Sequence, residues 1–161
     1  MRSLKIAIQQ EDFSLEQECR ELRAEHKDIG ALVTFTGLVR EMETSEDKNK
    51  LSSLFLEHYP GMTEKRLEDI AQEADQRWSL LDICIIHRIG ALKPADQIVL
   101  VAVSSMHRQD AFNACAFIMD FLKTSAPFWK KTSTADSQYW VEARESDAKA
   151  VEDWAETSDK R

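Results

Sequence analysis

Large apolar side chains first stand at alternate positions and then recur at helical spacing. In residues 4–8 every second side chain is a leucine or isoleucine, which predicts a half-buried strand. Residues 14–25 follow, with Ser14 and Gln17 at capping-box spacing and Cys19 on the apolar face of a predicted helix. The chain is therefore expected to open with a strand and then a helix.

The next pattern predicts strand, loop, strand and helix. Residues 30–40 are rich in β-forming side chains, whereas residues 41–50 are polar and without apolar periodicity, so we expect a mobile loop there. Residues 51–59 return as a strand. Apolar residues at three- and four-residue spacing then predict a helix over 63–78, with Thr63 available as its N-cap.

The apolar content is highest between residues 81 and 126. Residues 81–90 and 97–105 carry continuous apolar runs, which predict two central strands joined by a turn at 93–96. Residues 108–126 place a broad apolar face at helical spacing. Pro127 helps to end this helix.

The remaining chain predicts a β-hairpin and a final helix. Residues 127–145 contain two short strands around a polar turn, and residues 146–154 form a helix with Ser146 as N-cap. Strands and helices mix without strict alternation, which favours an α+β fold with an antiparallel or mixed sheet flanked by helices. We expect one domain over residues 1–161, with a mobile tail from 155 to 161.

Composition narrows the class of protein. A chain of 161 residues with 43% hydrophobic content can bury its own core without disulfides or metals. No run approaches the roughly 18 apolar residues of a membrane span, and the N-terminal apolar stretch is too short for a secretory signal. A cytoplasmic protein is expected. The net charge of −8 argues against a nucleic-acid partner.

The cysteines and histidines do not suggest a metal centre. The three cysteines are odd in number and far apart, and the four histidines are scattered, so neither set has a metal-ligand spacing. Apolar neighbours favour buried, structural thiols. These residues are Cys19, Cys84, Cys115, His26, His58, His87 and His107.

A cationic stretch interrupts the acidic chain at residues 121–135, where Lys123, Lys130 and Lys131 have no acidic neighbour. Such a patch suggests a small anionic ligand. On one interpretation Lys123 and Lys130 meet in a pocket, where crowded cations lower a lysine pKa and leave a neutral amine for base or nucleophilic chemistry. On the other, Lys123 complements the helix dipole and Lys130 is merely solvated.

Other candidate residues can likewise be interpreted either as part of an anion-binding site or as ordinary solvated charges. His107 and Arg108 lie at a strand-to-helix junction, which is a natural anion site but also an ordinary loop. Arg40 follows a strand, where its planar fork suits a phosphate or is simply exposed. Arg144 has glutamates nearby as local ion-pair partners.

Four aromatic residues stand close to the lysines. They could form the wall of a pocket for a flat heterocycle, or pack in the core as aromatic residues in strands usually do. We assign Phe128 to the core and leave Trp129 open. The four are Phe128, Trp129, Tyr139 and Trp140.

The order of several segments between Gly30 and Glu145 resembles the large subunit of molybdopterin synthase. The segments are GALVTFTGLVR, LFLEHYPGMTEKRLEDIAQEA, IIHRIGALKPADQIVLVAVSSMHRQDAFNACAFIMDFLKTSAPFWKK and YWVEARE. The resemblance implies an α/β hammerhead fold, a central homodimer and two copies of a small ubiquitin-like subunit. That subunit would supply sulfur as a thiocarboxylate on its C-terminal Gly-Gly tail. The substrate would be cyclic pyranopterin monophosphate (precursor Z), with no cofactor or metal.

The resemblance also implies residue roles. Lys123 and Lys130 match the two catalytic lysines. Our own hypothesis is that Lys123 acts in proton transfer or on the acyl carbon of the donor tail and that Lys130 holds the phosphate or the developing oxyanion. The matching substrate-binding positions are Arg40, His107, Arg108, Lys131 and Arg144, the last of which could serve the neighbouring subunit. Thr132 departs from the acidic residue usual after this lysine pair, which removes an ion-pair partner and leaves the patch more cationic.

Two alternatives remain open at this point. One is a non-catalytic homologue that binds a pterin or phosphate and acts as an interaction scaffold. The other is persulfide chemistry at Cys84 or Cys115, which their apolar surroundings disfavour because burial raises a thiol pKa.

Overall fold

A computed structural model of the chain describes residues 1–40, 53–133, 138–140 and 145–157. The predicted loop at 41–50 and the candidate Arg144 lie outside these residues.

The main sheet has four strands in the order β1 (Ser3–Gln9), β4 (Leu80–Arg88), β6 (Gln97–Ser105) and β2 (Ala31–Leu38). β1 runs parallel to β4, and the other two pairs are antiparallel. The continuous apolar runs of β4 and β6 are explained by their central position, where both faces of each strand are covered. The prediction of two central strands is confirmed.

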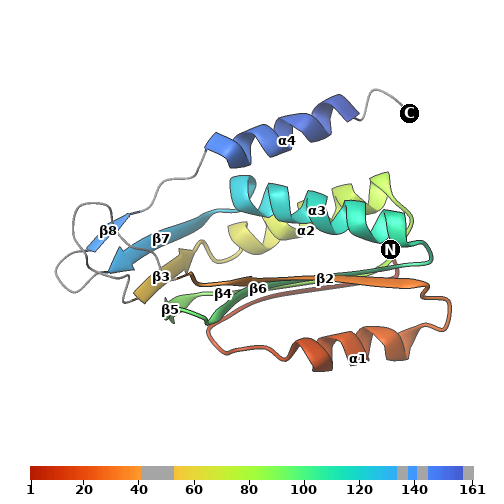
Figure 1. Cartoon of the computed structure of the whole chain (residues 1–161), viewed down its shortest axis with the longest axis horizontal. Coiled ribbons are helices and arrows are strands. Elements are labelled where there is room, and N and C mark those ends of the chain that lie inside the picture. The colour runs from red at the N-terminus through yellow and green to blue at the C-terminus, as the bar shows by residue number, and fades with distance from the viewer. Residues whose placement is uncertain (41–52, 134–137, 141–144, 158–161) are drawn as a thin grey trace.

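Helices cover both faces of this sheet. α1 (Leu15–Glu25) lies on one face, and α2 (Met62–Arg77) and α3 (Arg108–Ser125) lie side by side on the other (Figure 1). α4 (Glu145–Thr157) packs along α3. The predicted α+β fold with a mixed sheet and flanking helices is confirmed. Among the described residues, no helix is long and apolar enough to cross a membrane.

A second sheet stands at one end of the main sheet (Figure 1). Its order is β5 (Gly90–Leu92), β3 (Ser53–His58), β7 (Phe128–Ser133) and β8 (Gln138–Trp140), with every pair antiparallel. β5 begins at Gly90, which has a φ of 82°. Glycine adopts this positive φ at little cost because it has no Cβ. The chain turns there from the main sheet into the second one.

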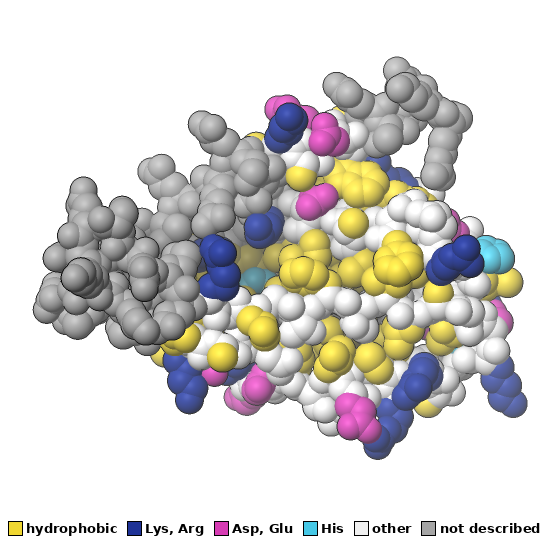
Figure 2. Space-filling model, in the orientation of Figure 1, with side chains coloured by type: hydrophobic (Ala, Val, Ile, Leu, Met, Phe, Trp, Pro, Cys, Tyr) yellow, Lys and Arg dark blue, Asp and Glu magenta, His cyan; other side chains and the backbone are white. Residues whose placement is uncertain are grey.

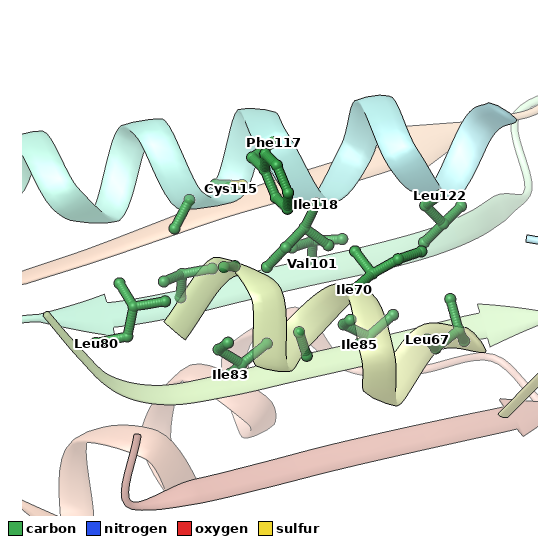
Figure 3. Packing of buried hydrophobic residues seen from close by; sticks show 14 of the residues in the cluster. Leu67, Ile70, Leu80, Ile83, Ile85, Val101, Cys115, Phe117, Ile118 and Leu122 are labelled. Carbon is green, nitrogen blue, oxygen red and sulfur yellow. The ribbon is translucent and has the colours of Figure 1, made fainter. Parts of the chain in front are cut away.

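The core follows from alternation along β4. Ile83 and Ile85 belong to the cluster beneath α2 and α3, whereas Cys84 and Ile86 belong to the cluster beneath α1. Figure 3 shows the larger cluster, in which Phe117 of α3 stands above the sheet among leucine and isoleucine side chains. Both faces of the central strands are therefore buried.

Three predicted boundaries need correction. α2 begins at Met62 with Gly61 as N-cap, so the prediction of Thr63 as N-cap is wrong. α4 begins at Glu145, so Ser146 lies inside the helix. The predicted end of the last helix at residue 154 is wrong, because α4 runs to Thr157; residues 158–161 of the predicted tail lie outside the described part of the chain.

Candidate functional site

The candidate lysines lie where α3 ends and β7 begins. Lys123 is exposed in the last turn of α3, and Lys130 is exposed on β7. The short connector between the two elements is held by Thr63 of α2, whose hydroxyl donates to the Pro127 carbonyl at 3.2 Å and accepts from the Tyr59 N–H at 3.0 Å. The start of α2 thus fixes the path from Lys123 to Lys130.

Alternation along β7 separates Lys130 from Lys131. Phe128 stacks on His87 with ring centroids 3.7 Å apart, whereas Trp129 contacts Tyr59 edge-on at 6.0 Å. Because neighbouring side chains of a strand point to opposite faces, Lys130 shares the face of Phe128 and Lys131 shares that of Trp129. Of the two lysines, Lys130 is the one that faces the main sheet.

The aromatic candidates divide in the same way. Phe128 packs against the main core, as predicted. Trp129, which the sequence left open, is half exposed beside Tyr59. Tyr139 and Trp140 lie on β8, and their side chains are outside the described part of the structure. The aromatic wall remains a prediction for these two residues.

Arg40 lies at the same end of the main sheet as the lysines. It follows β2, whose Leu38 is opposite Gln97 at the beginning of β6. The preceding Val39 exchanges backbone hydrogen bonds of 2.8 and 2.9 Å with the turn before β6. α3 returns over the sheet from the far end of β6, so its last turn, with Lys123, comes back to this end.

His107 and Arg108 lie at the opposite end. His107 is the N-cap of α3, and its backbone N–H donates to the Ser105 hydroxyl at 3.2 Å. α3 has 18 residues, so at about 1.5 Å per residue Arg108 and Lys123 stand roughly 22 Å apart along its axis. Figure 1 shows α3 extending from the second sheet to the far end of the main sheet. A single chain therefore does not bring these two groups into one pocket.

The surface around the lysine end is mixed in character. Figure 2 shows Lys and Arg side chains close to a histidine at the edge of the grey residues, with hydrophobic side chains along the adjoining surface. Cations beside apolar surface suit a ligand that combines a charged group with a flat ring system.

His87 is a residue that the sequence interpretation missed. It was grouped with the other scattered histidines, yet it is buried on β4 and contacts the face of β7 that carries Lys130. The available signal was its place in the alternation, since it follows Ile83 and Ile85 on the face covered by helices.

The thiols offer little nucleophilic character. Burial raises the pKa of Cys84 to about 12 and that of Cys115 to about 11, and burial also raises the pKa of Cys19. The prediction of buried thiols is confirmed for Cys84 and Cys115, and Cys19 is half-buried. Among the described residues, no three His, Cys, Asp or Glu side chains gather as a metal site would require.

Cys84 and Cys115 should resist alkylation in the folded protein. At pH 8 about one thiol in a thousand or fewer would be ionised at either position, and both side chains are shielded from the reagent. Iodoacetamide labelling followed by peptide mass spectrometry should modify Cys19 first and the other two only after unfolding in urea. Rapid modification of Cys115 in the native state would instead revive the persulfide hypothesis.

Comparison with known proteins gives one consistent family. The family model described as "MoaE protein" matches residues 8–125. The "Molybdopterin synthase catalytic subunit" of Pseudomonas aeruginosa is 52% identical over 153 residues, covering 95% of this chain and 100% of that protein. A solved "Molybdopterin biosynthesis MoaE protein" from Burkholderia ambifaria superposes with a TM-score of 0.81 at 50% identity, covering 96% and 99% of the two chains. The molybdopterin synthase structure from Staphylococcus aureus superposes with a TM-score of 0.74 at 36% identity, covering 88% of this chain and 98% of that chain.

Proposed function

The chain belongs to the MoaE protein family, and from that premise we propose that it acts as the catalytic subunit of a molybdopterin synthase. The observation that carries the proposal is identity near one half over almost the whole of both chains, together with a matching fold. Against the alternative of a non-catalytic scaffold, the relatives of comparable length are named as the catalytic subunit.

The reaction is a sulfur transfer to cyclic pyranopterin monophosphate. The donor is a thiocarboxylate at the Gly-Gly terminus of a small ubiquitin-like subunit, and two such subunits bind a homodimer of this chain in the cytoplasm. Both reactants are anionic. Two unit negative charges about 4 Å apart repel by roughly 4 kcal/mol at an effective dielectric of about 20, so close approach requires cations.

The cations at the α3–β7 end suit that requirement. Lys123 acts in proton transfer or on the acyl carbon of the donor tail, and Lys130 stabilises the substrate phosphate or the developing oxyanion. Arg40 lies at the same end of the main sheet and adds a planar fork for phosphate. Lys131 lies on the other face of β7, so its contribution is to the charge around the pocket.

The length of α3 supports a pocket built by two copies. His107 and Arg108 are separated from Lys123 by nearly the whole helix, so within one chain they cannot contact the same substrate. A twofold dimer brings one patch of a subunit against a different patch of its partner in two equivalent places. The second copy then supplies His107 and Arg108 to the pocket, and it can supply Arg144 in the same way.

Mixed dimers should therefore recover activity from two inactive variants. Lys123→Ala and Arg108→Ala dimers each carry two defective pockets, whereas a heterodimer carries one complete pocket and one doubly defective pocket. After random subunit exchange, about a quarter of the wild-type rate is expected. Product formation is measured before and after mixing. A mixture that stays as inactive as its parents would show that Lys123 and Arg108 act from the same chain or not in one pocket.

Reconstitution tests the activity itself. The purified chain is incubated with the thiocarboxylated small subunit and cyclic pyranopterin monophosphate, and the dithiolene product is measured after oxidation to a fluorescent pterin. A control with the carboxylate form of the small subunit should give no product, because it carries no sulfur. If the thiocarboxylated subunit binds but no dithiolene forms, the chain is a scaffold and the proposal fails.

A further inference from the structure

His87 is a buried polar residue at the end of an apolar row on β4. Ile83 and Ile85 precede it on the same face of the strand and belong to the main core. Only 5% of His87 is exposed, and its ring stacks on Phe128. Each ring nitrogen costs stability in the interior unless it is hydrogen-bonded, so an apolar side chain would fill this place at lower cost.

The hydrogen bond of the ring fixes its tautomer. Nδ1 lies 2.8 Å from the carbonyl oxygen of Arg88, which can only accept, so Nδ1 carries the proton. Burial lowers the pKa of His87 to about 4, and the charges of Lys130 and His58 act in the same direction, whereas the hydrogen bond to Arg88 acts to raise it. The ring is therefore neutral near pH 7, and Nε2 presents an unprotonated lone pair.

Lys130 is placed to use that lone pair. It stands two residues after Phe128 on the face of β7 that covers His87, and its positive charge acts on the imidazole. The other ionisable side chain acting on the ring is His58 of β3, opposite Phe128 in the sheet register, with its own Nε2 3.4 Å from Glu64.

We propose that His87 is a positioning residue whose Nε2 accepts a hydrogen bond from the Lys130 ammonium and turns it toward the substrate phosphate. A neutral acceptor orients the flexible lysine without adding a second positive charge behind it. The role of Lys130 toward the substrate phosphate rests on the proposed function, whereas its contact with His87 does not. The contact between the two side chains can be tested without turnover.

The first test follows Lys130 by NMR in protein carrying ¹³C-labelled lysine. His87→Phe keeps a ring against Phe128 but removes the acceptor, so the pKa of Lys130 should fall by about one unit. His87→Gln restores an acceptor and should recover most of that shift. His26→Gln, near the start of β4 beside Asp82, is the matched control and should leave Lys130 unchanged. An unchanged Lys130 pKa in His87→Phe overturns the inference.

A second test needs no substitution of the histidine. In ¹⁵N-labelled protein, Lys130→Met should shift the Nε2 resonance of His87 while Nδ1, bonded to Arg88, stays in place. Equal Nε2 shifts in the two proteins overturn the contact.

Turnover separates this inference from the proposed function. His87→Phe should lower kcat about tenfold with KM nearly unchanged, and His87→Gln should recover most of the rate, as expected for a group that orients Lys130 in the transition state. Wild-type protein that makes no dithiolene but shows both NMR effects would refute the proposed function and leave the contact standing. Normal turnover by His87→Phe refutes the positioning role.

Discussion

Lys123→Ala is expected to lose between about 100-fold and 10,000-fold of the dithiolene-forming rate, the usual range for removing a general acid or base. The side chain is exposed in the last turn of α3, so its removal should cost little stability. The measurement is single-turnover product formation with saturating thiocarboxylated small subunit. Affinity for that subunit, measured by calorimetry, should stay near the wild-type value.

Two controls give this prediction its discriminating power. Lys123→Arg keeps a positive charge but supplies no neutral amine near pH 7, so a rate as low as that of the alanine variant indicates proton transfer or nucleophilic chemistry. Lys27→Ala removes another exposed lysine, in the connection between α1 and β2, and should retain full activity. Near-normal product formation by Lys123→Ala would remove Lys123 from the mechanism.

Phe117→Ala is expected to lower the free energy of unfolding by about 3–5 kcal/mol. Phe117 is fully buried where α3 meets the end of α2 and α4, and its ring contacts Trp78, Phe121 and Trp154. Removing it leaves a cavity among large aromatic rings that cannot collapse easily. Urea unfolding followed by tryptophan fluorescence measures the change, since two of the contacting residues are tryptophans.

A matched control lies on the same helix. Phe112→Ala removes a ring that is 57% exposed, so its effect should stay within about 0.5 kcal/mol. If both phenylalanine variants lose less than about 1 kcal/mol, the ring of Phe117 is not packed in the interior against Trp78 and Trp154.

The elements with the strongest patterns were predictable from the sequence. β4 and β6 carry continuous apolar runs because helices cover both of their faces, and α3 shows a broad apolar face because it packs on the sheet. Ser14 was predicted as a cap and accepts from the Gln17 N–H at 3.3 Å. In these places local preference and tertiary packing agree.

The division into two sheets was not predictable from the same patterns. Residues 81–90 read as one strand, but Gly90 takes a positive φ and β5 pairs with β3 in the second sheet. Thr63 looked like a cap by residue type. Its hydroxyl instead joins two segments distant in the sequence, and a single sequence without pairing information does not contain that contact.

The candidate site was predictable in parts. Lys123 and Lys130 were grouped because a short proline-containing connector separates the two elements that carry them, and the structure has this connector. The separation of Arg108 from Lys123 could have been read from the predicted helix length. His87 required knowledge of which strand faces β7, since its ring meets Phe128 across 41 positions of sequence, from 87 to 128.

The rigidity of α3 constrains how the gene for this protein can change. One codon inserted between positions 108 and 123 would rotate one end of the helix against the other by about 100° and lengthen it by about 1.5 Å. Such a change would misalign both terminal groups at once, even though it altered no residue in either. Insertions and deletions should therefore be tolerated in the surface connections long before they are tolerated inside this helix.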